Sequence, residues 1–227
     1  MDPGYENLIN SLIKDGYLKT PEIIEAFKAI DRADFVPEEY KSEAYVNAPL
    51  PIGFNQTISQ PLTVAFMIEL LEPKAGDKIL DVGSGSGWTP ALLAHITSGG
   101  KSSEVGLPNI EDTEGKEALV FSLERIPELK EFAEKNIAKY GFVEKGIVKI
   151  IHADGSKGYK KEAPYDKIIA GAASEADIPE AWKRQLKIGG RIVSPVGQSI
   201  IVLDKISKKD YNQKEYFGFS FVPLVRD

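Results

Sequence analysis

The first 75 residues show a helical pattern of apolar positions, and no stretch among them predicts a strand. Apolar side chains at positions 5, 8, 9, 12 and 13 follow the three- and four-residue spacing of one helix face. Further helices are expected from Pro21 and from Pro61, because proline is favoured in the first turn of a helix. Residues 36–60 contain several prolines and predict a loop.

From residue 78 onward, short apolar runs alternate with helix-like stretches. Strands are expected at residues 79–82, 118–123, 147–152, 167–170 and 191–196, and helices at 88–96, 127–139 and 179–186. Such alternation predicts a parallel sheet with helices on both faces. Residues 199–206 and 215–222 flank a polar turn and predict a terminal antiparallel hairpin. The expected fold class is therefore α/β, with a mostly parallel, doubly wound, Rossmann-like sheet.

The same pattern divides the chain at about residue 75. An N-terminal helical region (1–75) and an α/β domain (76–227) are expected to pack as one unit. Within the α/β domain, residues 98–117 are rich in glycine, serine and acidic side chains and have few apolar ones. A segment of this composition buries too little apolar surface to fold by itself. We therefore expect a mobile surface insertion there.

Composition and charge exclude several kinds of site. The chain has no cysteine and only two histidines, which removes disulfides and thiolate zinc sites, and no metal is expected. The formal net charge of -6 disfavours nucleic acid as a partner. No apolar run reaches the roughly 18 residues of a membrane span, and the first residues do not resemble a secretory signal. A cytoplasmic protein without a membrane partner is the expectation.

The strongest chemical feature is a glycine turn that directly follows the first strand of the α/β domain. The sequence ILDVGSGSG at 79–87 has glycine at every second position of the turn and a carboxylate, Asp81, in the strand. Glycine permits positive φ and the close approach of a ligand to the backbone. Dinucleotide-binding folds space their glycines as G-x-G-x-x-G, and a carboxylate suits a cationic ligand better than a pyrophosphate. A plain strand-to-helix turn is the alternative without a ligand.

Two more acidic residues follow later strands. Glu124 ends the second strand, where a carboxylate can accept hydrogen bonds from both hydroxyls of a ribose. A solvated side chain is the alternative for Glu124, and a ribose alone does not separate NAD from another adenosyl ligand. Asp154, before Gly155, follows the third strand and can accept from an adenine amino group. Like Asp81, both stand at the carboxyl ends of strands, where open α/β sheets bind ligands.

Short sequence blocks spread along the chain carry a family resemblance. The most specific is QTISQP at 56–61, which glycine-turn methyltransferases do not generally share, and LPIG precedes it at 50–53. Matching blocks continue through the glycine turn to APYD at 163–166, LKIGGR at 186–191 and FVPL at 221–224. Across nearly its whole length the chain therefore resembles the protein-L-isoaspartate O-methyltransferases.

The resemblance implies a reaction and assigns residues to it. The cofactor would be S-adenosyl-L-methionine, and the methyl acceptor would be the free α-carboxylate of L-isoaspartyl residues in damaged proteins and peptides. The substrate-binding residues would be Thr57, Ile58 and Ser59, with the Ser59 hydroxyl as the catalytic group. The cofactor-binding residues would be Asp81, Gly83, Ser84, Gly85, Glu124, Arg125, Asp154 and Gly155. A carboxylate is ionised at neutral pH and needs no general base, so catalysis would consist mainly of positioning.

Some positions depart from the family pattern or have a second interpretation. Asn47 stands where the family usually carries aspartate, and Trp88 replaces a more usual tyrosine. Ser59 also suits the N-cap of the helix that opens near Pro61. Two other functions stay open: a methyltransferase of this fold with another substrate, and a nonenzymatic adaptor that binds an adenosyl ligand. An NAD-dependent dehydrogenase is disfavoured by the glycine spacing.

Overall fold

The computed structural model describes residues 1–100 and 120–226. Its main sheet has seven strands in the order β5-β4-β3-β6-β7-β8-β9. In chain order these are β3 (Ile79–Val82), β4 (Val120–Glu124), β5 (Val148–His152), β6 (Tyr165–Ala170), β7 (Leu186–Val196), β8 (Ser199–Lys205) and β9 (Tyr211–Phe217). Strands β3 to β7 pair in parallel, and β8 and β9 are antiparallel to their neighbours. The expected α/β class is confirmed.

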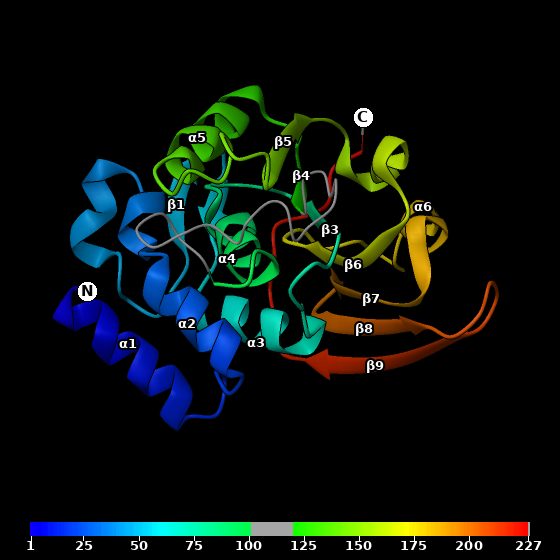
Figure 1. The fold of residues 1–227 in the computed structure, drawn as a ribbon, viewed down its shortest axis with the longest axis horizontal. Helices are drawn as coiled ribbons and strands as arrows, with labels where there is room; N and C mark the ends of the chain where they lie inside the picture. The colour runs from blue at the N-terminus through cyan, green and yellow to red at the C-terminus, as the bar shows by residue number, and fades with distance from the viewer. Residues whose placement is uncertain (101–119, 227) are drawn as a thin grey trace.

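The helices lie on both sides of this sheet. They are α1 (Pro3–Lys14), α2 (Pro21–Ala29), α3 (Pro61–Leu71), α4 (Trp88–Thr97), α5 (Pro127–Ala138) and α6 (Glu180–Gln185). Short 3-10 turns lie at Arg32–Phe35, Glu38–Glu43, Gly155–Lys157 and Lys160–Glu162. Figure 1 shows α1 and α2 at one side of the molecule, strands β8 and β9 at the other, and α3 and α4 between them.

Alternate side chains of the central strand β3 enter two different cores. The strand is buried along its whole length, and successive residues of a strand point to opposite faces. Ile79 packs in the core beneath α3, α4 and α5. Leu80 and Val82 pack in the other core, which contains Trp182 of α6. A strand covered on both faces reads as a continuous apolar run, which explains why its position was predicted correctly.

The N-terminal helices pack against the α/β part of the chain. Tyr5 of α1 is buried and donates a 2.8 Å hydrogen bond to the carbonyl of Ile30. Phe27 of α2 meets Trp88 of α4 edge to face, with ring centroids 5.5 Å apart. Helices α1 to α3 therefore share one apolar core with a face of the sheet, while a division of the chain at residue 75 stays a prediction.

The expectation that the first 75 residues contain no strand is wrong. Residues 50–58 form a small hairpin of β1 (Leu50–Gly53) and β2 (Gln56–Ile58). Its two-residue turn holds Phe54 and Asn55 at φ of 53° and 57°. Positive φ at both turn positions matches the right-handed twist of paired strands. Three- and four-residue strands, one of them containing proline, are too short for an apolar alternation to reveal.

The last strand begins and ends earlier than expected. A strand was expected at 215–222, but β9 ends at Phe217 because it pairs with β8 from Lys205↔Tyr211 to Ser199↔Phe217. As an edge strand, β9 is largely exposed and carries polar residues, which concealed its first half. The segment after it crosses the end of β6, where Ala173 bonds the backbone of Val222 and Leu224 at 2.8 Å each.

The expected insertion at 98–117 falls mainly outside the described residues. Helix α4 ends at Thr97, and residues 98–100 follow it. The described chain resumes at Val120, the first residue of β4. None of the helices in residues 1–100 and 120–226 has the length and apolar character that crossing a bilayer requires.

Candidate active site

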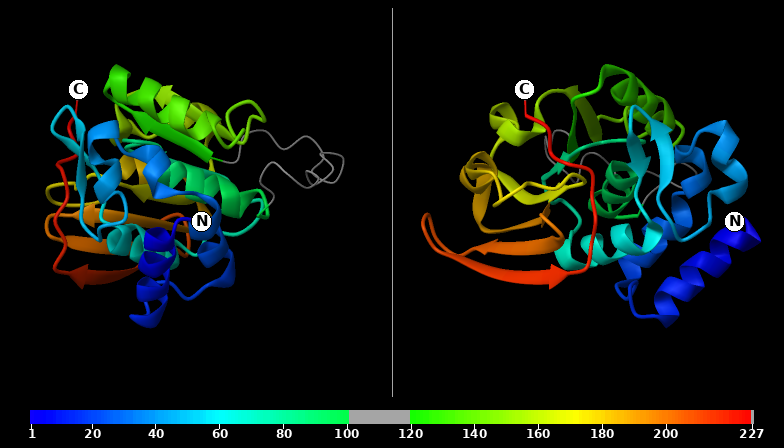
Figure 2. Two further views of the ribbon diagram at one scale, coloured as in Figure 1. Left: turned by 90° about the vertical axis from the view of Figure 1, so that its left-hand side faces the viewer. Right: turned by 180° about the vertical axis from the view of Figure 1, so that it is seen from behind.

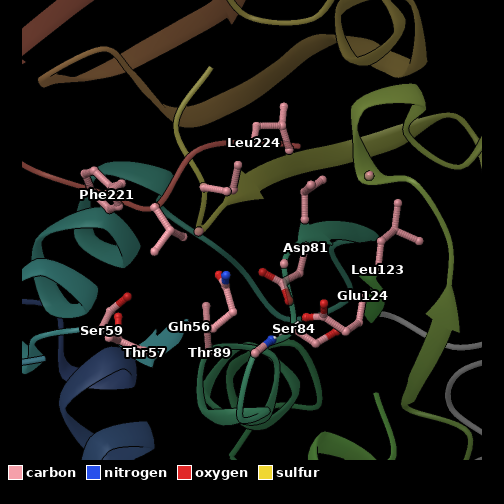
Figure 3. A pocket seen from close by; sticks show the side chains of 18 of the residues that line it. Gln56, Thr57, Ser59, Asp81, Ser84, Thr89, Leu123, Glu124, Phe221 and Leu224 are labelled. Atoms are coloured by element: carbon pink, nitrogen blue, oxygen red, sulfur yellow. Dashed lines mark hydrogen bonds between the residues drawn. The ribbon is translucent and has the colours of Figure 1, made fainter. Parts of the chain in front are cut away.

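A cleft opens at the carboxyl ends of β3, β4 and β6, beside the central strand of the sheet. In open α/β sheets this edge is the usual ligand site, where successive connections leave the central strand in opposite directions. Figure 3 shows Asp81, Ser84 and Glu124 together on one side of the cleft, with Thr57 and Ser59 on the other. Most residues assigned from the sequence line it, namely Thr57, Ile58, Ser59, Asp81, Gly83, Ser84, Gly85, Glu124, Arg125 and Gly155.

The glycine turn forms part of one wall of the cleft. Gly83 and Gly85 line the cleft at φ of 97° and 52°, in the left-handed region that favours glycine. Gly87 has a different role, because a Cβ there would lie 3.0 Å from the carbonyl oxygen of Ala133 in α5. The first two glycines therefore keep the backbone open to a ligand, and the third allows α4 to pack closely against α5.

Asp81 is a buried carboxylate at the end of β3. The Ser122 hydroxyl donates to its Oδ2 at 2.5 Å, and the Ser84 hydroxyl lies 2.6 Å from that of Ser122. Burial raises the pKa of Asp81 to about 7; the Ser122 hydrogen bond opposes this shift, and the charge of Glu124 adds to it. No basic side chain among the described residues forms an ion pair with Asp81. This wall therefore presents the Asp81 carboxyl group without a basic partner among the described residues, which suits a cationic ligand.

Glu124 is almost fully buried and connects the glycine turn to the end of β4. Its Oε2 accepts the backbone N–H of Gly85 at 2.9 Å, and its Oε1 accepts that of Ile126 at 3.0 Å. Each carboxylate oxygen can accept a second hydrogen bond, so both remain able to bind a hydroxyl. The interpretation of Glu124 as a solvated side chain is wrong. Its bond to the glycine turn was not foreseen, since nothing in the sequence reveals a contact between these two segments.

Asp154 and Gly155 continue this wall beyond β5. Gly155 lines the cleft, and its carbonyl accepts the indole N–H of Trp182 at 2.8 Å. The carboxylate of Asp154 accepts the N–H of Ser156 at 2.9 Å and pairs with Lys157. Asp154 itself is not among the residues that line the cleft.

The facing wall is the segment that leads from β2 into α3. Ser59 is half-buried, and its hydroxyl makes no hydrogen bond to another described residue. The capping interpretation of Ser59 is wrong, because the N-cap of α3 is Gln60. Asn47 provides the side-chain bond instead, since its Oδ1 accepts the N–H of Leu62 at 3.0 Å. A neutral amide oxygen is sufficient for this bond, so the departure from aspartate preserves it.

A third side of the cleft was missed by the sequence analysis. Residues 221–225 line it, although they lie far along the chain from both other walls. Figure 2 shows this C-terminal segment on the same side of the molecule as the β1–β2 hairpin. The only sequence signal for this segment was the FVPL block at 221–224. It indicated a family resemblance but did not predict that the segment contacts the cleft.

The cleft therefore combines an acidic, glycine-lined wall with a small hydroxyl-bearing one. The carboxylates and glycines suit a cationic ligand that also carries hydroxyls. The hydroxyl of Ser59, which has no hydrogen-bond partner among the described residues, can donate to an anionic group on the other side of that ligand. No cluster of His, Cys, Asp or Glu suited to a metal ion occurs among the described residues.

Comparison with known proteins gives the same family along nearly the whole chain. Residues 4–227 match the model of the family described as protein-L-isoaspartate(D-aspartate) O-methyltransferase. The chain is 41% identical to the protein-L-isoaspartate O-methyltransferase of Ignicoccus hospitalis, covering 100% of both chains. It is 44% identical to protein-L-isoaspartate O-methyltransferase 2 of Archaeoglobus fulgidus, over 89% of this chain and 84% of that one.

A solved structure shares the fold. It is the crystal structure of a beta-aspartate methyltransferase from Plasmodium falciparum in complex with S-adenosyl-L-homocysteine. The TM-score is 0.82 at 22% sequence identity, with 100% of both chains covered.

Proposed function

The chain belongs to the protein-L-isoaspartate(D-aspartate) O-methyltransferase family, and we propose that the cleft at the carboxyl ends of β3 and β4 is its active site. The enzyme transfers a methyl group from S-adenosyl-L-methionine to isoaspartyl residues of damaged proteins, a repair reaction. One observation supports this location above all: the QTIS segment and the glycine-turn wall face each other across a single cleft.

The acidic wall has the features that S-adenosyl-L-methionine requires. When bound, this cofactor supplies a methyl group on a positively charged sulfur. Asp81 offers a buried carboxylate without a basic partner among the described residues, which suits the cationic methionine part. Glu124 keeps one lone pair on each oxygen for the ribose hydroxyls. Arg125 and Gly155 line the same wall, and the assignment of Asp154 to the adenine amino group stays a prediction.

The facing wall would hold the methyl acceptor. A carboxyl group with an ordinary pKa near 4 is ionised at neutral pH, so no general base has to remove a proton. Ser59, whose hydroxyl has no other described partner, would donate to the substrate carboxylate and orient one oxygen toward the methyl group. Thr57 and Ile58 line the same side of the cleft. Orientation of the reacting atoms and exclusion of water then account for the rate enhancement.

A methylation assay with two matched peptides tests this function. One peptide would carry an L-isoaspartyl residue and the other a normal aspartyl residue at the same position, each with radiolabelled S-adenosyl-L-methionine. We expect methyl esters on the isoaspartyl peptide alone. Equal labelling of both peptides would favour another carboxyl substrate, and cofactor binding without any labelling would favour an adaptor.

We also propose that the protein acts in the cytoplasm on proteins and peptides and does not use nucleic acid. The net charge of -6 supports this choice of substrate, because a nucleic-acid substrate is held mainly through its phosphates. Competition by total RNA or DNA in the peptide assay would contradict it.

A further inference from the structure

Arg32 is a fully buried cation that holds the backbone behind the substrate wall. Its Nη1 donates to the carbonyl oxygens of Ala44 at 2.6 Å and Val46 at 3.2 Å. Its Nη2 donates to those of Ala48 at 2.9 Å and Ser59 at 3.1 Å. One guanidinium therefore connects the loop before β1 to the segment that presents the Ser59 hydroxyl.

The charge of Arg32 has no counter-charge among the described residues. The four acceptors of its guanidinium are neutral carbonyls, and the ring of Trp88 lies 5.5 Å from its central carbon. Burial lowers the pKa of Arg32 to about 10, so the group remains protonated at neutral pH. A buried charge without a partner is costly, which makes an anion brought by the substrate a fitting counter-charge.

Lys205 is another buried cation, and its contacts lie away from the cleft. Its Nζ donates to the carbonyls of Lys183 at 2.6 Å and Leu186 at 2.8 Å, at the end of α6. Lys205 ends β8, which runs antiparallel to β7, so it lies at the sheet edge opposite the cleft. Arg32 differs because one of its acceptors belongs to Ser59, whose side chain lines the cleft.

We propose that Arg32 is a positioning residue for methyl transfer, which fixes the Ser59 segment and places positive charge behind the site of the substrate carboxylate. The inference rests on the proposed function of this cleft. Arg32 does not contact the substrate; it acts through the Ser59 backbone and through its charge. The planar guanidinium donates in several directions at once, whereas a lysine ammonium carries the charge without this fixed geometry.

Three variants separate positioning from general stability: Arg32→Met, Arg32→Lys and the control Lys205→Met. Each would be measured by steady-state kinetics on the isoaspartyl peptide, by titration with S-adenosylhomocysteine and by thermal melting. We expect Arg32→Met to lower kcat/KM by up to about 100-fold, the scale of a small misplacement of reacting groups. Arg32→Lys should recover part of that loss. Both should bind S-adenosylhomocysteine like the wild type, since the other wall supplies those contacts.

The Lys205→Met control shows how the loss of a buried cation away from the cleft affects stability and activity. Lys205→Met should lower the melting temperature and leave kcat/KM unchanged. Wild-type kcat/KM in either Arg32 variant would overturn the inference, and so would loss of S-adenosylhomocysteine binding in both, because Arg32 would then only support the fold. If Arg32→Met does not fold, Arg32→Lys decides the question. A wild-type protein that does not methylate the isoaspartyl peptide would refute the proposed function itself, whereas an active wild type with equally active variants refutes only this inference.

Discussion

The backbone N–H of Gly85 donates a 2.9 Å hydrogen bond to Oε2 of Glu124, so the carboxylate proposed to bind ribose also fixes the glycine turn. The other oxygen holds the N–H of Ile126 at 3.0 Å, just before α5 begins. One side chain thereby links the loops that follow β3 and β4. Changes at this position should affect the shape of the pocket and its ligand contacts together.

Replacing Glu124 with glutamine should therefore weaken both cofactor binding and the fold. Hydrogen bonds to a charged group contribute roughly 1.5–3 kcal/mol, which corresponds to a loss of about 10- to 150-fold in affinity. Calorimetric titration with S-adenosylhomocysteine and a thermal melt would measure the two effects. Glu128→Gln, at an exposed position in the first turn of α5, is the matched control; it should leave the affinity unchanged and lower stability by no more than about 1 kcal/mol, the contribution of an acid at a helix N-terminus. Unaltered affinity in Glu124→Gln would remove Glu124 from the cofactor site.

Gly85→Val should abolish cofactor binding. The residue has φ of 52°, which a β-branched side chain adopts only with strain, and the new side chain would project from a lining residue of the cleft. Gly189→Val imposes comparable strain at φ of 81° on an exposed position outside the cleft, with no atom within 4 Å of the added Cβ. The control should bind S-adenosylhomocysteine normally at a reduced melting temperature. Binding by a folded Gly85→Val variant would contradict the assigned pocket.

Cofactor affinity should rise as pH increases through about 7, the pKa of Asp81. Only the ionised carboxylate attracts a cationic ligand, and burial keeps the group protonated at lower pH. The same shift has the opposite effect on the unliganded fold. Because the folded pKa exceeds the ordinary value of 3.8, the stability contributed by Asp81 is complete below that value and is lost as pH rises through about 7.

Calorimetric titrations with S-adenosyl-L-methionine between about pH 6 and 8 would measure this change in cofactor affinity. Asp81→Asn keeps an acceptor for Ser122 but has no charge to titrate, so its affinity should be lower and nearly independent of pH. An equal pH dependence in the wild type and in Asp81→Asn would assign the titration to another group.

Ser59→Ala should impair catalysis without destabilising the protein. Loss of a hydrogen bond to a charged carboxylate corresponds to about a 10- to 150-fold decrease in rate constant. The melting temperature should stay the same, because the side-chain cap of α3 comes from Asn47. Asn47→Ala, in contrast, should lower the free energy of unfolding by about 1 kcal/mol. Kinetics on the isoaspartyl peptide together with denaturant unfolding of both variants would test this pair, and full activity of Ser59→Ala would remove its catalytic role.

Much of the α/β part was predictable because its signals are local. β3 is buried on both faces and apolar except for Asp81, and the glycine turn follows it directly, so strand, turn and the start of α4 were placed correctly. Proline at the first turn likewise marked the start of α3. These features depend on neighbouring residues in the chain and on no distant contact.

The rest of the site depends on contacts between distant segments. Arg32 shows this most clearly: a lone arginine in a polar stretch gives no sign that it is buried, since its acceptors are backbone carbonyls up to 27 positions away. The cap of α3 also depends on a distant residue, because Asn47 and not Ser59 accepts the N–H of Leu62. A side chain from another loop reached the helix end, whereas local rules consider only the residue that precedes the helix.

The third wall of the cleft has a consequence for the newly made protein. Residues 221–225 are hydrogen-bonded beside Ala173 and leave the ribosome after every other part of the cleft. While translation is under way, the glycine turn and the β1–β2 hairpin can fold, but the cleft between them stays open on one side. The complete pocket forms only after residues 221–225 have emerged and docked beside Ala173, so repair activity should begin no earlier than that.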